Sequence, residues 1–208
     1  MDHVQRREHY LQVASRVFLE KGISAATMQD VADAAGVPRI LVYRVFKTKR
    51  LLLDAILERV VDTIHEVYSE PNRVYGMRVF SLARAARPCP EPFLLVLHYC
   101  QSGVEQQGWQ EAVADAIAPY TLRAWCRPAP SAPAGADERA AYASRLNVGW
   151  IVETLARWLQ DDDGLDEATR LRWWGRMSRE YHLGLREAFR LGPPTEVYTV
   201  VGEGAEIP

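Results

Sequence analysis

The chain has 208 residues, of which 48% are apolar, and this is enough for a packed core in one or two domains. The formal net charge of −2 hides an asymmetry, because residues 1–50 carry nine Lys or Arg against five acids and the remainder carries 16 against 22. No stretch approaches the ~18 uninterrupted apolar residues of a membrane span, and the polar first ten residues lack the apolar core of a signal peptide. We therefore expect a cytoplasmic protein with no membrane partner.

The first predicted elements form a helix-turn-helix within residues 27–50. Thr27 suits an N-cap because its hydroxyl can accept the backbone N–H of Asp30, whose carboxylate is favoured in a first turn. Gly36 can adopt the positive φ that ends a helix, and Pro38 suits the first position of the next one. The pattern predicts a helix from Thr27, a turn over residues 35–38 and a candidate recognition helix over residues 39–46.

These residues resemble the tetracycline-repressor (TetR) family of bacterial regulators over roughly the first 50 positions. The family's first helix ends in a pattern like Ala-x-x-Leu-Phe-x-x-x-Gly, matched by Ala14, Val17, Phe18 and Gly22. Its next helix begins Thr-x-x-x-Ile-Ala, matched by Thr27, Val31 and Ala32. The helix-turn-helix that follows in the family is matched by Ala35, Gly36, Val37, Tyr43, Phe46, Lys49 and Leu52, with Pro38, Ile40 and Leu41 as departures from Ser, Gly and Thr. The resemblance implies an all-α fold, with a three-helix DNA-binding head followed by an α-helical ligand-binding and dimerisation bundle.

Roles within the head follow from side-chain chemistry and from the resemblance. Arg39 or Arg44 can make the bidentate pairing with guanine O6 and N7, and Arg44 is the preferred base reader. Leu41 cannot make the phosphate contact of the family threonine and is expected to meet a thymine methyl. Tyr43 and Lys49 match family residues that contact phosphates, although Tyr43 also suits a partly buried core position. The predicted DNA contacts are Thr27, Arg39, Ile40, Leu41, Tyr43, Arg44 and Lys49, whereas Val42 and Phe46 are assigned to the core.

From residue 51 onward the apolar period is helical. Leu52, Ile56, Val60 and Ile64 repeat every four residues, which predicts one long helix over residues 51–67 that ends before Pro71. A helix over 74–86, an extended proline linker over 88–92, and interior helices over 93–104 and 110–125 follow. Residues 128–136 contain three prolines and a glycine and predict a flexible loop.

The last two predicted helices, over residues 140–159 and 166–190, have an apolar pattern that indicates how the chain assembles. The first has hardly any polar face, so it must be covered on two sides. Two such helices from each of two chains make a four-helix interface, and we expect a homodimer with Ile151 and Trp174 in it. The alternative is that these helices close a monomeric core. The predicted organisation is a DNA-binding domain over 1–50, a ligand-binding and dimerisation domain over 51–190, and a packed or disordered tail over 191–208.

A ligand site is expected inside the helical bundle, where the resemblance implies one. Polar atoms on apolar helices need partners, which favours His98, Asn147 and Trp150. Aromatic residues at helical spacing are also ordinary core residues, so the assignment has a plain structural alternative. The predicted ligand-binding residues are His98, Tyr99, Trp109, Tyr120, Asn147 and Trp150.

Catalytic and metal chemistry find little support in the sequence. Cys89, Cys100 and Cys126 cannot all pair and form no CxxC motif, so neither a disulfide framework nor a zinc module is expected. No paired acid and base, activated nucleophile or phosphate loop has usable spacing. We therefore predict no enzyme, no metal and no cofactor, and instead a repressor released from a palindromic double-stranded operator by a small aromatic or apolar effector. The alternative is a DNA-binding or partner-binding regulator with no small-molecule inducer.

Overall fold

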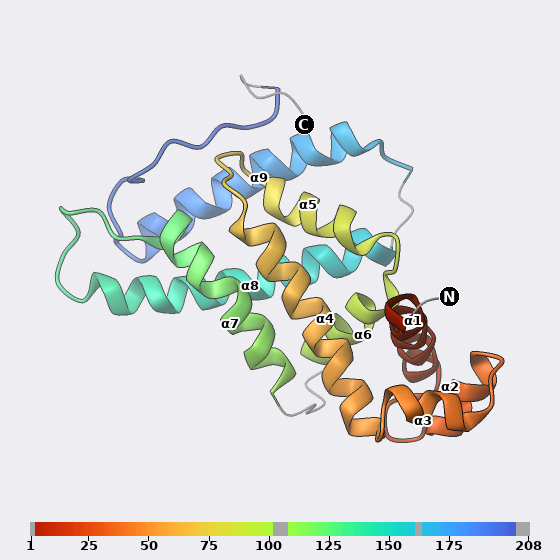
Figure 1. The fold of residues 1–208 in the computed structure, drawn as a ribbon. Helices are drawn as coiled ribbons and strands as arrows, with labels where there is room; N and C mark the ends of the chain where they lie inside the picture. The colour runs from red at the N-terminus through yellow and green to blue at the C-terminus, as the bar shows by residue number, and fades with distance from the viewer. Residues whose placement is uncertain (1–2, 102–107, 161–163, 203–208) are drawn as a thin grey trace.

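The structure is a computed structural model that describes residues 3–101, 108–160 and 164–202. Every regular element in these ranges is helical, as the sequence predicts, and Val74 and Thr199 form an isolated parallel β-bridge. Figure 1 shows a small head, made of α1 to α3, at one end of a larger helical body, with α4 running from one into the other.

The head consists of α1 (His3–Lys21), α2 (Met28–Ala34) and α3 (Arg39–Val45). The predicted helix-turn-helix is confirmed, including the positive φ of 65° at Gly36. Pro38 differs slightly from expectation, because its ψ of 136° makes it the N-cap of α3 and not the first helical residue. Val42 and Phe46 are buried in the head, as predicted.

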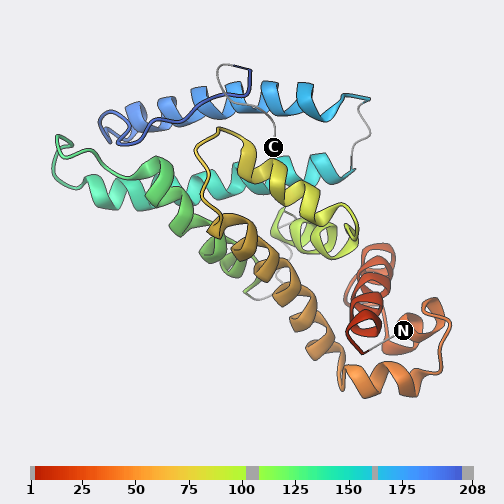
Figure 2. The same cartoon turned by 45° about the horizontal axis from the view of Figure 1, so that its top comes forward.

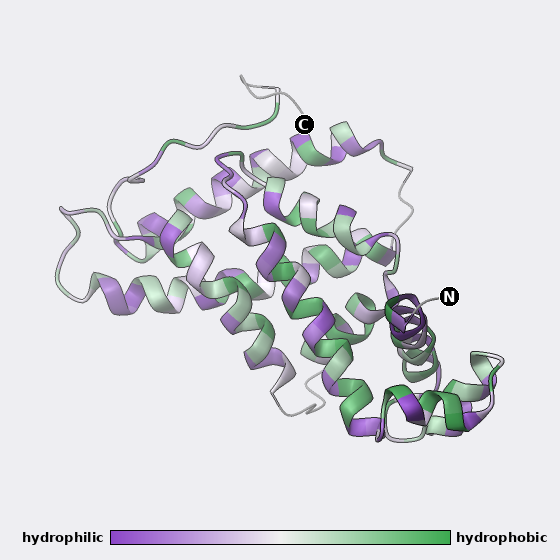
Figure 3. Cartoon of the chain, in the orientation of Figure 1, coloured by the Kyte–Doolittle hydropathy of each residue, from purple (hydrophilic) through white to green (hydrophobic). Residues whose placement is uncertain are grey.

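Helix α4 (Lys49–Ser69) is the long connection that the sequence predicts. It begins two residues earlier than expected because the Thr48 hydroxyl accepts the N–H of Leu51 at 3.1 Å and caps the helix. Leu52, Ile56, Val60 and Ile64 are buried along one side. Hydrophobic and hydrophilic residues alternate along α4 in Figure 3, as expected for a helix that packs on one side only.

The body contains five further α-helices in the described ranges: α5 (Met77–Ala86), α6 (Glu91–Gln101), α7 (Trp109–Thr121), α8 (Ala136–Gln160) and α9 (Glu167–Ala188). The expected proline linker is shorter than predicted, because Pro92 lies in the first turn of α6, where its missing N–H costs nothing. The expected helix over 110–125 is two elements, since α7 carries Pro119 near its end and passes into a π-helical turn, η1 (Leu122–Cys126). Residues 102–104 of the helix expected over 93–104 lie outside the described residues.

The residues after α9 form a packed C-terminal segment over 189–202. Tyr75 donates its N–H to the Thr199 carbonyl at 2.9 Å, and Thr199 donates to the Arg73 carbonyl at 3.0 Å. Leu191 is buried, and the Ala129 N–H bonds to its carbonyl at 2.8 Å. The loop over 128–136 is therefore tied to the C-terminal segment at Ala129, whereas most of its other residues are exposed, and its flexibility stays a prediction.

Helices α8 and α9 lie along one edge of the body, as Figure 2 shows. Between them, the Trp150 ring stacks on Trp174 at 4.4 Å and on Tyr181 at 4.5 Å. Ile151 and Trp174 are both buried within one protomer. The expectation that these two residues belong to a subunit interface is therefore wrong, because the protomer's own core already covers them.

Candidate nucleic-acid interface and body cavity

Helix α3 has one buried face and one exposed face. Val42 anchors the buried face, whereas Arg39, Ile40 and Arg44 are exposed. Leu41 and Tyr43 are half-buried at the border between the two faces. The exposed face therefore presents two guanidinium groups and one branched apolar side chain, which is the set that reads base edges and thymine methyls in a major groove.

The two arginines of α3 differ in the contacts that they make within the head. The Arg39 guanidinium donates to the Tyr43 hydroxyl at 2.6 Å and lies 4.8 Å from the centre of its ring. In the described part of the chain, no carboxylate pairs with Arg44 or with the neighbouring exposed Lys47. Arg44 is thus the cation of α3 that can turn to a base without giving up an internal contact.

The predicted cap of α2 forms a complete capping box. The Thr27 hydroxyl accepts the Asp30 N–H at 3.2 Å and donates to the Asp30 carboxylate at 2.7 Å. Hydrogen bonds from Lys21 and from Thr27 hold the pKa of Asp30 well below its usual range. Both hydrogen-bonding roles of the Thr27 hydroxyl are therefore used within the head, and its contact with a phosphate stays a prediction.

Lys49 has an internal role that the sequence reasoning missed. Its ammonium group donates to the backbone carbonyl of Ile23 and, at 2.6 Å, to that of Ala26. These bonds tie the connection between α1 and α2 to the first turn of α4. An ammonium carries three donors, so a phosphate contact by Lys49 also stays a prediction.

A second contact joins the head to the body, between α1 and α6. The Tyr99 hydroxyl on α6 accepts the backbone N–H of Ile23 at 3.1 Å. Glu91, at the start of α6, accepts from Arg16 at 2.7 Å and from Gln12 at 3.1 Å. Tyr99, predicted as a ligand residue, therefore holds the end of α1 against the body.

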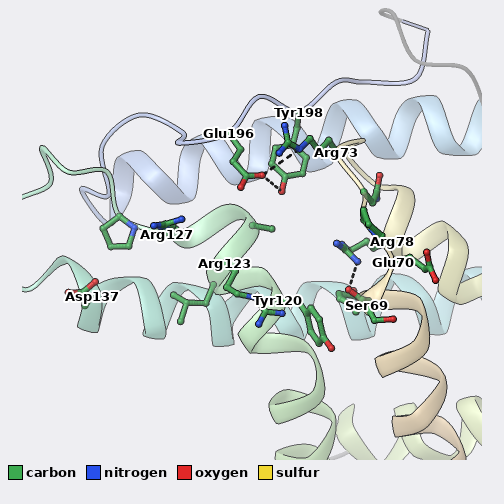
Figure 4. A pocket seen from close by; sticks show the side chains of 16 residues that line it. Ser69, Glu70, Arg73, Arg78, Tyr120, Arg123, Arg127, Asp137, Glu196 and Tyr198 are labelled. Carbon is green, nitrogen blue, oxygen red and sulfur yellow. Dashed lines mark hydrogen bonds and ion pairs between the residues drawn. The ribbon is translucent and has the colours of Figure 1, made fainter.

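The main cavity of the body has a volume of about 880 Å³ and lies at the end of α4 that is far from the head. Its walls come from the end of α4 and the residues after it, from the start of α5, from the end of α7 and η1 with the residues that follow, from the start of α8, and from the C-terminal segment. Figure 4 shows the labelled side chains around this space. The lining residues are Tyr68, Ser69, Glu70, Pro71, Asn72, Arg73, Arg78, Tyr120, Leu122, Arg123, Ala124, Arg127, Pro128, Asp137, Glu196 and Tyr198.

Cations and tyrosines meet in this cavity. Arg78 donates to the Tyr68 carbonyl at 2.7 Å, and its guanidinium lies 5.4 Å from the centre of the Tyr68 ring. Arg123 lies 4.7 Å from the centre of the Tyr120 ring. Burial lowers the pKa of Arg78, and the Arg123 cation lowers it further, so the two like charges lie near enough to repel.

The structure does not gather the six predicted ligand residues into one site. Only Tyr120 lines the cavity. His98 is exposed on α6, and Trp109 is buried with its ring centre 5.9 Å from that of Tyr99. Asn147 is fully buried, and its two amide atoms have no hydrogen-bond partner among the described residues. The cavity residues that sequence reasoning missed come from three segments that are far apart in the sequence: Tyr68, Arg73 and Arg78, then Arg123 and Arg127, and then Tyr198.

None of the described helices is long and apolar enough to cross a bilayer. Within the same residues, no group of three or more His, Cys, Asp or Glu side chains is placed to hold a metal ion.

The residues of the head match a family of known proteins. Residues 11–56 match the family model for bacterial regulatory proteins of the tetR family. Over 65 residues, the chain is 37% identical to the HTH-type transcriptional repressor KstR2 of Rhodococcus jostii, a match that covers 31% of this chain and 32% of that protein. The chain thus matches about a third of the length of this curated relative, a transcriptional repressor.

Solved structures match the fold over nearly the whole chain. A tetR-family transcriptional regulator from Streptomyces coelicolor superposes with a TM-score of 0.52 at 20% identity, covering 93% of this chain and 92% of that one. AibR in complex with isovaleryl coenzyme A and operator DNA superposes with a TM-score of 0.51 at 17% identity, covering 90% of this chain and 100% of that one. The arrangement of a helix-turn-helix head on an all-helical body is therefore shared with these regulators.

Proposed function

We propose that this chain, which belongs to the tetR family of bacterial regulatory proteins through residues 11–56, is a repressor of transcription that a small molecule releases from operator DNA. The observation that carries the proposal is the exposed face of α3, where Arg39, Ile40 and Arg44 stand on a helix whose other face is locked into the head. This is the geometry of a recognition helix in a helix-turn-helix.

In the proposed complex, Arg44 reads a guanine and Arg39 either does the same or contacts a phosphate. Ile40 and Leu41 supply apolar surface for thymine methyls. Lys47, exposed just past α3, neutralises phosphate without reading sequence. The excess of basic residues in the first 50 positions favours this orientation of the head toward a polyanion.

The proposed release mechanism uses α4. This helix begins at the head and ends with Tyr68 and Ser69 in the wall of the 880 Å³ cavity, so one rigid element spans from effector to DNA-binding head. A ligand that prefers the cavity shape of the released state shifts the population by its differential affinity. AibR, a fold relative, is known with isovaleryl coenzyme A and with operator DNA, and a ligand-responsive mode is consistent with that likeness.

We further propose a homodimer through the outer face of α8 and α9, the edge seen in Figure 2. Trp173 and Met177 lie four residues apart on α9 and are 60% and 51% exposed, and Tyr142 and Leu146 form the corresponding exposed pair on α8. A Cβ added at Gly149 or Gly184 would meet nothing within 4 Å, which leaves room for a close helix from a partner. A two-fold partner lets two heads read the two halves of a palindrome.

The DNA test begins with selection of bound duplexes from a randomised library by the full chain, followed by fluorescence anisotropy on the selected and on a scrambled duplex. Arg44→Ala should cost about 1–3 kcal/mol on the selected duplex and little on the scrambled one. Lys47→Ala is the matched control and should weaken both alike, while flattening the log–log salt dependence by roughly 0.9. Equal binding to both duplexes at every salt concentration, with no effect of either change, contradicts operator recognition.

The dimer test uses light scattering at micromolar concentration. Trp173→Glu places an uncompensated charge in the proposed interface and should yield monomer. Val197→Glu is the control, because Val197 is an exposed apolar residue of the C-terminal segment and belongs to neither α8 nor α9. A wild-type monomer, or equal effects of the two changes, contradicts the interface.

A regulator without an effector is the second candidate. It predicts that a cavity ligand leaves operator affinity unchanged. A typical coupling of about 1–3 kcal/mol weakens operator binding roughly 5- to 150-fold, so the anisotropy assay with and without a cavity ligand separates the two candidates.

A further inference from the structure

The cavity at the end of α4 contains more arginine than its carboxylates can neutralise. Arg73 faces Glu196 at 3.9 Å, which is a long ion pair. For Arg78, Arg123 and Arg127, no carboxylate partner is present in the described part of the chain. Figure 4 shows the two remaining lining acids, Glu70 and Asp137, at opposite ends of the space, with Arg78 and Arg123 between them.

The three unpaired guanidinium groups converge from different elements. Arg78 comes from α5, Arg123 from η1, and Arg127 from the residue that follows η1. In Figure 4, Arg78 points into the space from one side, and Arg123 and Arg127 lie on the other. Arg78 is half-buried, and Arg123 and Arg127 are exposed at the wall. Like charges that line one space stabilise no fold by themselves, whereas an anion placed between them can accept several charge-assisted hydrogen bonds.

A buried hydroxyl at the same place lacks a partner. The Tyr68 side chain is only 1% exposed, it lines the cavity, and its hydroxyl has no hydrogen-bond partner among the described residues. A buried polar atom of this kind costs free energy unless something satisfies it. The hydroxyl oxygen itself is closed to solvent, so a ligand in the cavity reaches it only after neighbouring side chains move, and the preference for an anion rests on the arginine charges.

The rest of the wall is apolar or aromatic. Tyr68 and Tyr120 meet edge to face with ring centres 5.5 Å apart, and Tyr198 covers the space from the C-terminal segment. Leu122 and Pro128 add aliphatic surface. A volume of about 880 Å³ accommodates an organic molecule of ordinary effector size, not merely an inorganic ion.

We infer that this cavity binds an amphipathic organic anion, with its acidic group between Arg78, Arg123 and Arg127 and its apolar body against Tyr68, Tyr120 and Tyr198. The inferred binding of an anion deepens the proposed function. It rests on that function only where the anion is taken to be the effector that releases the DNA. It revises the sequence expectation of an aromatic or apolar effector, because the residues that supply the charge are not recognisable as a set in the sequence.

The test uses two fluorescent probes that share one aromatic body. 8-Anilinonaphthalene-1-sulfonate carries an anionic group, and N-phenyl-1-naphthylamine lacks it. Titration of the full chain should give at least tenfold tighter binding of the sulfonate, since one charged hydrogen bond is worth about a factor of ten or more. Arg123→Gln and Arg127→Gln should each remove most of that preference. Arg84→Gln is the matched control, because Arg84 is an exposed arginine of α5 that does not line the cavity.

A competition experiment on the wild-type chain covers the case in which a variant fails to fold. Decanoate should displace the bound sulfonate probe, whereas decanol at the same concentration should not. Equal affinity for the two probes, equal displacement by decanoate and decanol, or an equal loss in Arg84→Gln overturns the inference. None of these arms contains DNA, so failure of operator binding in the separate anisotropy assay contradicts the proposed function alone.

Discussion

Replacing Arg186 by methionine should lower the free energy of unfolding. The loss should be larger than for any other arginine of the body, judged by the hydrogen bonds that each arginine makes. Arg186 lies near the end of α9 with 6% of its surface exposed, and burial lowers the pKa of its guanidinium. It pairs with backbone carbonyls, at distances of 2.7 to 3.2 Å, from Trp125, Arg127, Leu191, Gly192 and Pro193. One side chain therefore fastens η1 and the C-terminal segment to α9.

The magnitude follows from which carbonyls water can reach after the change. The bond to Trp125 is buried, so that carbonyl stays without a partner at about 1–3 kcal/mol, whereas the buried Leu191 carbonyl keeps its bond from the Ala129 N–H and loses less. The other three bonds are partly buried, and water can replace them at smaller cost. The free energy of unfolding should fall by about 3–5 kcal/mol in total.

Urea unfolding followed by circular dichroism measures this loss. Arg157→Met is the matched control, because Arg157 is an exposed arginine that forms an i,i+4 ion pair with Glu153, worth about 0.3–0.5 kcal/mol. Arg186→Lys, which keeps three donors, should recover part of the loss. A loss below about 1 kcal/mol for Arg186→Met refutes the reasoning that this network holds the C-terminal segment.

Three further changes test other parts of the fold. Gly76→Ala should lower the free energy of unfolding by about 3 kcal/mol in a urea titration, because φ is +80° and the new Cβ would lie 2.6 Å from Trp174 Cδ1 and 3.2 Å from the Gly175 nitrogen; an unchanged midpoint would show that this turn can relax. Thr48→Ala should remove the cap of α4 and cost about 1 kcal/mol, and Thr48→Ser should restore it. Burial lowers the pKa of His182 to about 3, below its unfolded value, so its neutral form contributes stability that is complete above about pH 6.5 and is lost as the pH falls toward 3. His182→Gln should therefore flatten the fall in unfolding free energy between pH 7 and pH 4, and an equally steep fall in the variant would assign that pH dependence to other groups.

The head was predictable because its signals are local. Thr27 and Asp30 cap a helix three residues apart, Gly36 ends it, and Val42 with Phe46 marks the buried face of the next. Each of these relations lies within a few residues, so the sequence specifies them before any tertiary contact forms.

The body was predictable as helices but not as a site. Arg78, Arg123 and Tyr198 become neighbours only when three distant segments pack together, and no periodicity connects them. His98 is a polar residue on an apolar helix and yet lies exposed, because the side of α6 that it occupies is uncovered. Lys49 matches a family position whose expected partner is phosphate, whereas in the fold its ammonium group also finds two backbone carbonyls.

The contact between α1 and α6 changes how motion can pass between the two ends of the molecule. A head joined to the body through α4 alone would simply follow α4, to which Lys49 ties the connection between α1 and α2, and its tilt would not depend on α6. The Tyr99 bond to Ile23 and the Glu91 bonds to Gln12 and Arg16 supply a second point of attachment, beside the continuous chain of α4. Two attachments make a parallel linkage, in which the tilt of the head depends on how far α4 moves relative to α6. A sliding of a fraction of a helical turn between those two helices is then converted into a rotation of α3.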